Sequence, residues 1–305
     1  RDAVAACEDA GVDGFELNFG CPHGMCERGM GSVVGQDPDL VERITGWVKA
    51  AAMRPVLVKL TPNVADVTLA GLAAQRGGAD GISLINTVNS VMGVDLDSLE
   101  PQPSVGGLSS HGGYCGPAVK PIALHMVSAL ATHPDFHLPI SGIGGIGSWR
   151  DAAEFLAMGA TTVQVATAAM HHGFRIVREM EAGLLEYLEL RGLAHVGELT
   201  GRAATKLRRW EQLDLNYKVV ARIDPDICIG CQKCYVACDE GAHQAIGLVP
   251  GSRVPEILAD CVGCNLCSHV CPVDGCITMV PVSHGQPPLP WAKHPQNPAR
   301  ACATV

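Results

Sequence analysis

The sequence has few of the features that indicate nucleic-acid or membrane binding. Acidic residues outnumber basic ones by 31 to 22, giving a formal net charge of −9, and no run of lysine or arginine stands out. We therefore do not expect nucleic acid or an anionic membrane as a primary partner. No apolar stretch approaches the roughly 20 residues that cross a bilayer. A secretory signal is also lacking.

The chain also lacks an initiating methionine. It begins at Arg1, inside an amphipathic helix pattern over residues 2–10, so we expect the N-terminus of a longer protein to be absent. Its 305 residues, 47% of them hydrophobic, suffice for one large domain and one small one. No glycine-rich dinucleotide fingerprint occurs in the chain.

Eight of the 14 cysteines form two copies of a C-x2-C-x2-C-x3-C run, and Pro272 follows the second copy. Three thiolates so closely spaced can wrap one face of an iron–sulfur cube, and in two-cluster ferredoxins the fourth cysteine of each run ligates the other cluster. The first expected [4Fe–4S] centre is held by Cys228, Cys231, Cys234 and Cys271. The second is held by Cys261, Cys264, Cys267 and Cys238.

Structural zinc or disulfides are the alternatives for these cysteines. Zinc prefers two separated pairs of ligands, often including histidine, so the spacing favours clusters. Committing so many cysteines to metal suits a reducing cytoplasm, which is the compartment we expect. Because clusters carry single electrons, they also imply a second redox centre in the remaining residues.

The first 190 residues alternate between short apolar strands and helices. Strands are expected at residues 14–19, 55–60, 81–86, 139–143 and 161–166. Helices are expected over residues 38–52, 120–132, 148–158 and 173–190, and a further helix should end at about residue 76. Nearly continuous apolar strands indicate a parallel sheet buried on both faces. Polar or small residues at the strand ends favour an α/β fold of the (β/α)8 TIM-barrel type, with about five of its eight strands in this chain.

We expect four segments along the chain. The C-terminal part of the barrel covers residues 1–190, and a connecting segment covers 191–222. A small α+β ferredoxin domain with two clusters covers residues 223–280. The proline-rich tail over residues 281–305 is predicted to be disordered.

Small residues follow the last two expected barrel strands. These are Gly144 and Gly145 after one strand and Ala166 and Thr167 after the other. Loops at these positions of a barrel commonly bind phosphate, because small residues let backbone N–H groups approach the anion; the alternative is that the glycines only turn the chain. Together with two clusters, a phosphate site suggests FMN, which links one-electron to hydride chemistry.

Several strand ends carry polar side chains. Lys59 could stabilise negative charge on a reduced flavin, or could form a salt bridge with a barrel carboxylate. Asn18, Asn86 and Thr87 suit a planar substrate with alternating carbonyls and N–H groups, or could cap loop backbone. Cys21 could act as a general acid, although a lone loop cysteine is more often incidental.

Several motifs together resemble the dihydropyrimidine dehydrogenases. The active-site loop of that family resembles Glu16-Leu17-Asn18-Phe19-Gly20-Cys21-Pro22-His23-Gly24-Met25, and further matches are Val58-Lys59-Leu60-Thr61-Pro62-Asn63, Ile85-Asn86-Thr87, Gly112-Gly113-Tyr114-Cys115-Gly116-Pro117 and the two cysteine runs. The match extends over nearly everything except the tail. It is closest to the FMN/iron–sulfur subunit of the bacterial NAD-dependent enzymes, and the related dihydroorotate dehydrogenases share the barrel.

The resemblance implies an enzyme that reduces uracil or thymine, with hydride passing from FMN to C6 and a proton from Cys21 to C5. It implies that Asn18, Asn86 and Thr87 bind the pyrimidine. The residues implied to bind FMN are Lys59, Gly116, Gly144, Gly145, Ala166 and Thr167. Electrons would come from NADH through a partner subunit that carries FAD, so a hetero-oligomer is expected. Gly20 departs from relatives that have serine there.

Two other functions stay open, namely a dihydroorotate-type or other ene-reductase with a fused ferredoxin, and an electron-transfer module without catalysis. Cys26 could compete with Cys21 as the acid, and His23 could orient the loop or contact substrate, although both are more simply read as bystanders. The other isolated candidates are read as buried, incidental or solvent-facing residues: Cys7, Cys115, Cys276, Cys302, His171 and His172.

Overall fold

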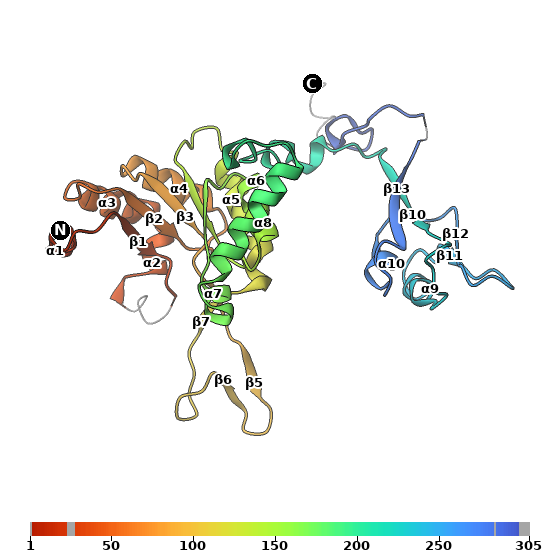
Figure 1. The fold of residues 1–305 in the computed structure, drawn as a ribbon, viewed down its shortest axis with the longest axis horizontal. Coiled ribbons are helices and arrows are strands. Elements are labelled where there is room, and N and C mark those ends of the chain that lie inside the picture. Colours follow the sequence, from red (N-terminus) through yellow and green to blue (C-terminus); the bar gives the residue numbers. More distant parts are fainter. Residues whose placement is uncertain (1, 23–27, 284, 299–305) are drawn as a thin grey trace. The chain divides into compact units, whose positions relative to one another are not determined.

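The computed structural model describes residues 2–22, 28–283 and 285–298. The chain divides into two compact units, Arg1–Leu207 and Arg208–Val305, and each is described by itself (Figure 1). The predicted connecting segment, residues 191–222, divides between the two units. Its first part packs on the first unit, where Leu199 is buried with Leu156 and Leu188, and its last part begins the second unit.

The first unit is built on five parallel strands. They are β1 (Phe15–Phe19), β2 (Val56–Leu60), β3 (Gly81–Leu84), β8 (Ile140–Ile143) and β9 (Thr162–Gln164), hydrogen-bonded in that order. Each lies within a predicted strand, and the α/β alternation is confirmed. The strands of successive βα units along the chain are thus adjacent in the sheet, as in the wall of a barrel.

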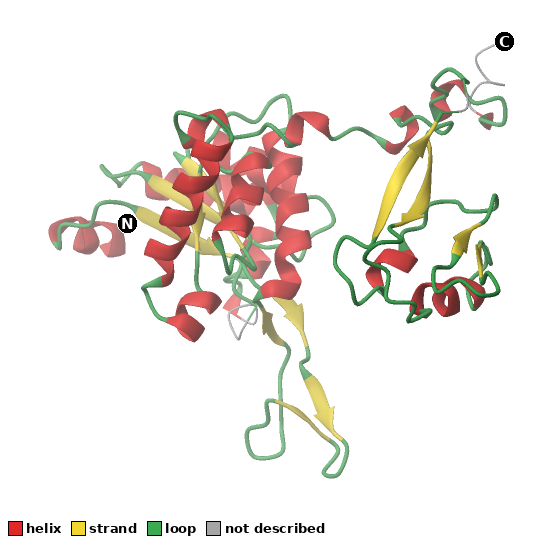
Figure 2. Ribbon diagram, turned by 45° about the vertical axis from the view of Figure 1, so that its right-hand side comes forward, coloured by secondary structure: helices red, strands yellow, loops and turns green. Residues whose placement is uncertain are grey.

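Helices connect the strands and cover one face of the sheet (Figure 2). The main ones are α3 (Pro38–Lys49), α4 (Val67–Arg76), α5 (Lys120–Ala131), α6 (Trp149–Ala157) and α8 (Ile176–Leu190), and the shorter ones are α1 (Asp2–Asp9), α2 (Ser32–Gly35), α7 (Thr167–His172) and the 3-10 turns η2 (Pro117–Val119), η3 (Val196–Glu198) and η4 (Ala204–Lys206). Asp37 caps α3, because its carboxylate accepts from the N–H groups of Asp39 and Leu40.

The two faces of the sheet differ in polarity. Val58, Leu60 and Ile82 are fully buried in the core that the helices cover. The alternate positions carry Glu16, Asn18, Lys59, Ser83, Ser141 and Gln164. Because successive side chains of a strand point to opposite faces, these polar groups share the face turned away from the helices. The second face is therefore polar, although Ser83 and Ser141 on it are buried, as expected for a sheet buried on both faces.

The predicted glycine-rich loop before α5 contains an arm of short strands. Strand β4 (Val88–Ser90) pairs antiparallel with β7 (Gly112–Tyr114), and β5 (Gly93–Asp95) pairs with β6 (Glu100–Gln102). The arm extends from the same end of the sheet as α7 (Figure 1).

The second unit holds the two cysteine runs. Strand β10 (Lys218–Ile223) pairs antiparallel with β13 (Ile277–Val282), and the two-residue strands β11 (Ile246–Gly247) and β12 (Glu256–Ile257) pair with each other. Helices α9 (Lys233–Asp239) and α10 (Leu266–His269) each begin within a cysteine run. This α+β composition is the one predicted.

The proline-rich tail differs from the predicted disorder over residues 285–298. It forms the turn η6 (Trp291–Lys293), whose Trp291 ring lies 5.8 Å from that of Trp210 in η5 (Trp210–Gln212). The Leu289 N–H donates to Asp214 Oδ1 at 2.8 Å. Aromatic packing and a carboxylate acceptor thus order a segment that composition alone marks as unstructured. Within the described ranges, no helix is both long and apolar enough to cross a membrane.

Candidate functional site

Eight of the ten residues predicted outside the cysteine runs line one cavity of the first unit. The cavity measures about 270 Å³ and lies at the carboxyl ends of the strands. The eight are Lys59, Asn86, Thr87, Gly116, Gly144, Gly145, Ala166 and Thr167. His171 and His172, at the end of α7, also line it. The predicted flavin and substrate residues therefore share one site, and the two histidines join them.

Gly145 lies where the backbones of two loops come closest. Its φ of +77° is unfavourable for other residues, and a Cβ there would lie 2.8 Å from Lys120 Cβ and 2.9 Å from Gly116 O. Gly144, at φ +131°, is similarly close to Ala123 and Ile85. Only glycines permit this close approach of the two loops, which leaves a small-residue cradle of the kind that accommodates a phosphate.

A partly buried ion pair secures the cradle loop. Asp151, at the start of α6, accepts from Lys120 Nζ at 2.6 Å, from Ser148 Oγ at 2.9 Å and from the Gly147 N–H at 3.0 Å. Burial alone would raise the pKa of Asp151, but these hydrogen bonds and the charge of Lys120 outweigh burial and lower it. Asp151 therefore stays ionised and ties the glycine loop to two helix starts.

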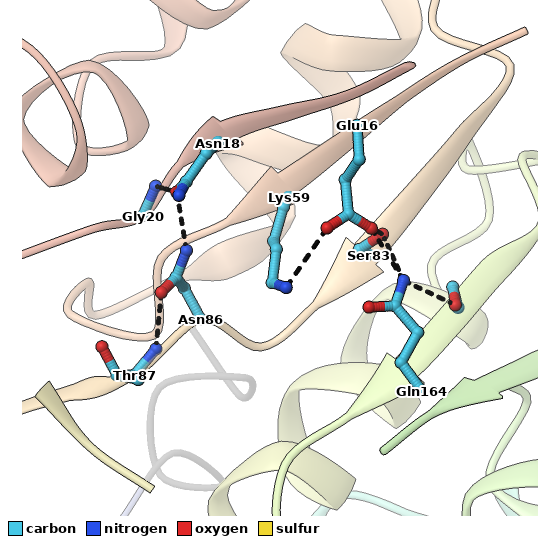
Figure 3. Close-up of polar contacts among 9 residues, drawn as sticks. Glu16, Asn18, Gly20, Lys59, Ser83, Asn86, Thr87 and Gln164 are labelled. Carbon is cyan, nitrogen blue, oxygen red and sulfur yellow. Dashed lines mark hydrogen bonds and ion pairs between the residues drawn. The ribbon is translucent and has the colours of Figure 1, made fainter. Parts of the chain in front are cut away.

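Two asparagines form a hydrogen-bonded pair beside the cavity (Figure 3). Asn18 Oδ1 accepts from Asn86 Nδ2 at 2.8 Å and from the Gly20 N–H at 3.2 Å. Asn86 Oδ1 accepts from the Thr87 N–H at 2.8 Å. The two amides orient each other, so both predicted roles, ligand contact and loop capping, are compatible with the geometry.

Gly20 is close to this pair for a steric reason. A Cβ at position 20 would lie 2.4 Å from Asn86 Cβ and 2.7 Å from its Nδ2. A serine at this position would therefore require a different Asn86 orientation. Glycine in place of serine at position 20 thus removes a possible hydroxyl contact and allows Asn86 to pack closer to the loop after β1.

Cys21 follows Gly20 and is half-buried. Its carbonyl accepts from the Ser32 N–H at 3.0 Å, which anchors the start of the loop to α2. Cys21 does not line the cavity. It is near the Asn18–Asn86 pair because it directly follows Gly20, whose N–H donates to Asn18 Oδ1. His23 and Cys26, the other candidates in this loop, lie outside the described residues, as does Cys302.

Lys59 forms the salt bridge that was one of its two predicted roles, and it also lines the cavity. Its Nζ lies 3.2 Å from Glu16 Oε1. Glu16 Oε2 accepts from Ser83 Oγ at 2.6 Å and from Gln164 Nε2 at 2.7 Å. Burial alone would raise the pKa of Glu16, but these bonds and the Lys59 charge lower it.

The network around Lys59 was missed by reasoning from strand ends alone. Gln164 Nε2 also contacts Ser83 Oγ and Ser141 Oγ, so each of the five strands contributes one polar side chain (Figure 3). The available signal was the placement of Glu, Lys, Ser and Gln inside otherwise apolar strands. Asn63 was also missed. Its Nδ2 donates to Thr87 O at 3.2 Å and so supports the loop that carries Thr87.

The cysteines of the second unit divide between two pockets in the predicted crossed pattern. One pocket is lined by Cys228, Cys231, Cys234 and Cys271. The other is lined by Cys238, Cys261, Cys264 and Cys267. The pocket of the first set is the narrower of the two. Within the described residues, no group of three His, Cys, Asp or Glu side chains is arranged to hold a metal ion.

The two runs also repeat in backbone conformation. Gly230 and Gly263 have φ values of 69° and 68°, and Gln232 and Asn265 have φ values of 61° and 67°. Repeated left-handed turns before α9 and α10 indicate two equivalent ligand loops. Burial raises the pKa of the free Cys267 thiol to about 11, so metal binding must displace its proton.

Each ligand set has a backbone hydrogen bond to a sulfur from within its own cysteine run, from Tyr235 to Cys234 and from Ser268 to Cys267. Two further N–H groups, from outside the runs, contact other sulfurs. The Ala221 N–H donates to Cys261 Sγ at 3.4 Å and the Ala245 N–H to Cys238 Sγ at 3.2 Å. Both sulfurs belong to the second ligand set. Of the cysteines outside the runs, Cys7 and Cys115 are exposed, and Cys276 is buried beside the first set.

Comparison with protein-family models finds two matches. Residues 2–188 match dihydroorotate dehydrogenase, and residues 221–279 match a 4Fe-4S dicluster domain. In the solved structures, a ligand-free dihydroorotate dehydrogenase from Eimeria tenella is similar with a TM-score of 0.50 and 20% identity, covering 63% of this chain and 55% of that one. This similarity supports the predicted barrel fold.

Among curated proteins, the NAD-dependent dihydropyrimidine dehydrogenase subunit PreA of Escherichia coli K12 is 48% identical over 274 residues, which is 89% of this chain and 66% of that protein. The catalytic subunit of dihydroorotate dehydrogenase B from Pyrococcus horikoshii is 46% identical over 192 residues, covering 63% of this chain and 60% of that protein. The chain thus spans just under two thirds of the length of these relatives.

Proposed function

This chain belongs to the dihydroorotate dehydrogenase family, and from that premise we propose that it acts as the pyrimidine-reducing subunit of an NAD-dependent dihydropyrimidine dehydrogenase. The substrate would be uracil or thymine and the product the 5,6-dihydropyrimidine. The observation that carries this proposal is the shared site, in which the hydrogen-bonded Asn18–Asn86 pair adjoins the glycine cradle in a chain that also has a dicluster domain.

The residues of the cavity fit FMN. Gly144 and Gly145, with Ala166 and Thr167 opposite, leave room for a phosphate at a loop where a Cβ would collide with backbone. Gly116, in the loop before η2, would approach the same cofactor, and Lys59 would face its ring. The chemistry that FMN supplies when bound is hydride transfer, here to C6 of the pyrimidine.

The protein's own groups would bind and protonate the substrate. The ring carbonyls and N–H groups of a pyrimidine match the donors and acceptors of Asn18, Asn86 and Thr87. Cys21 would deliver the proton to C5, so that one hydride and one proton reduce the double bond. The half-buried position of Cys21 lets it reach bulk solvent to recover that proton.

The dicluster domain would supply the electrons. We propose that Cys228, Cys231, Cys234 and Cys271 hold one cluster and that Cys238, Cys261, Cys264 and Cys267 hold the other, because each set surrounds its own pocket. NADH would be oxidised at FAD in a partner subunit, giving a cytoplasmic hetero-oligomer. The relative PreA is itself described as a subunit.

The test is an anaerobic NADH-oxidation assay of the full-length protein with its flavoprotein partner. Uracil, thymine and orotate are compared in the wild type, in Cys21→Ala and in the control Cys7→Ala, whose thiol is exposed on α1. We expect turnover with uracil or thymine, lost in Cys21→Ala and kept in Cys7→Ala. Full FMN and iron content without turnover on any substrate would instead make the chain an electron carrier.

A dihydroorotate dehydrogenase is the second candidate function. The barrel is 46% identical to the Pyrococcus horikoshii catalytic subunit, nearly the identity shared with PreA over a longer span. The longer match to PreA favours the first candidate, because it covers 89% of this chain and so extends beyond the barrel toward the dicluster domain. Turnover with orotate alone would instead favour the dihydroorotate dehydrogenase.

A further inference from the structure

A polar layer crosses all five strands beneath the cavity. Its members are Glu16 of β1, Lys59 of β2, Ser83 of β3, Ser141 of β8 and Gln164 of β9. The register places Lys59 beside Ser83 and Ser83 beside Ser141 on neighbouring strands. The layer is therefore fixed by the backbone hydrogen bonds of the sheet, the most rigid part of this unit.

Lys59 and Gln164 are the two members of this layer that also line the cavity, and of these only Lys59 can carry a charge. A lysine side chain is a flexible four-carbon stem, and holding its ammonium at one point costs rotamer entropy. The contact with Glu16 Oε1 restricts that motion, and only 19% of the Lys59 side chain is exposed. The ammonium is thus held in place before any ligand binds.

Glu16 is in turn held by two neutral donors. Ser83 Oγ and Gln164 Nε2 both donate to Oε2, which leaves Oε1 for Lys59. Gln164 is itself placed by Ser141 Oγ at 3.1 Å. Hydrogen bonds to an ionised acceptor are stronger than those between neutral groups. The Glu16 carboxylate therefore has one defined orientation, with Lys59 as its charged partner (Figure 3).

We propose that Glu16 is a positioning residue that acts through Lys59, holding the lysine ammonium against the bound flavin ring with the support of Ser83, Gln164 and Ser141. This inference rests on the proposed FMN site. A fixed cation beside the ring stabilises the negative charge that develops on reduction, whereas a mobile cation stabilises it less. Glu16 would therefore act on the flavin by fixing that cation, and not through its own charge.

The experiment measures the reduction potential of FMN in the loaded full-length protein, with FMN affinity as a second readout. In Glu16→Ala we expect the potential to fall toward that of Lys59→Met. The FMN dissociation constant should rise roughly tenfold, which corresponds to the loss of one charge-assisted contact. Added to Lys59→Met, the Glu16→Ala change should not lower the potential further, because there is no ammonium left to position.

Two further variants keep the test decisive. Ser83→Ala leaves the charge of Glu16 in place but removes one of its donors, so it should shift the potential in the same direction by a smaller amount; it carries the test if Glu16→Ala does not fold. Glu42→Ala is the matched control, because Glu42 pairs with Arg76 on the exposed surface of α3 and α4. It should leave the potential unchanged.

The outcomes separate this inference from the proposed function. A potential that rises equally in Glu16→Ala with and without Lys59 would show that Glu16 acts only as a through-space charge, which overturns the inference. An unchanged potential in Glu16→Ala and Ser83→Ala would overturn it too. If the wild-type protein binds no FMN, the proposed function itself fails, and the inference fails with it.

Discussion

Replacing Gly145 with alanine tests whether the cradle needs glycine for space or only for backbone freedom. Gly145 and Gly173 have φ values of +77° and +76°, yet a Cβ at Gly145 would meet Lys120 Cβ, Gly116 O and Lys120 N within 3 Å, and a Cβ at Gly173 would meet nothing within 4 Å. Gly173→Ala is therefore a control without crowding. At ψ 173° Gly173 lies in a backbone region that essentially only glycine adopts, so its alanine variant has a backbone cost of about 1–3 kcal/mol.

The crowding at Gly145 adds a second cost. Two of the three atoms are backbone and cannot move aside alone, so overpacking should add about 1–3 kcal/mol to the cost of the positive φ. Urea unfolding followed by circular dichroism measures the stability of each variant against the wild type, and FMN content measures the cradle. We expect Gly145→Ala to be less stable than the wild type by at least that amount and to lose FMN, whereas Gly173→Ala keeps FMN. Wild-type stability of Gly145→Ala, or full FMN in it, would refute the argument.

Three other predictions concern charge and metal. Because the pKa of Asp151 lies below its ordinary value of 3.8, its carboxylate stabilises the fold above that pH and loses this effect as the pH falls through the folded-state pKa. Asp151→Asn should be less stable at pH 7 by about 1–2 kcal/mol, with a flatter acid-unfolding profile; an unchanged profile would contradict this. Cys238→Ala should lose roughly half of the bound iron and Cys276→Ala none, as measured by iron analysis; equal iron in both variants would refute the ligand sets. The N–H···S bonds to Cys238 and Cys261 predict that their cluster has the higher potential. The cluster that remains in Cys238→Ala is then the one of lower potential. In a titration of the wild type followed by electron paramagnetic resonance, the signal of that cluster should appear last; if it appears first, the assignment is contradicted.

The fold of both units could be predicted from local patterns. Strands such as Pro55–Leu60 combine an apolar run with a following helix cap, and Asp37-Pro38 marks the start of α3 with two independent signals. The cysteine runs predict a ligand topology because cluster geometry restricts the spacing. The structure then places each predicted set of four cysteines around one pocket.

The arm and the tail could not be predicted in the same way. Strands β5 and β6 are three residues each, with Pro101 inside β6, so neither has a period that a sequence pattern could show. The order of residues 285–298 depends on Asp214 and Trp210, which lie more than 70 positions earlier in the chain. Composition reports on the local chain, and these contacts are not local.

The polar layer shows why strand ends alone were not enough. Ser83 and Ser141 are small and lie in the middle of apolar strands, where each alone is read as a tolerated core residue. Only the sheet register places them beside Lys59 and under the same carboxylate. The sequence predicts that Lys59 needs a partner, because an unpaired buried ammonium is costly. It cannot say that the partner is Glu16, 43 positions away, since that depends on which strands are neighbours. Motifs can therefore propose candidate catalytic groups, whereas the residues that contact and orient these groups emerge only from the packing of the strands.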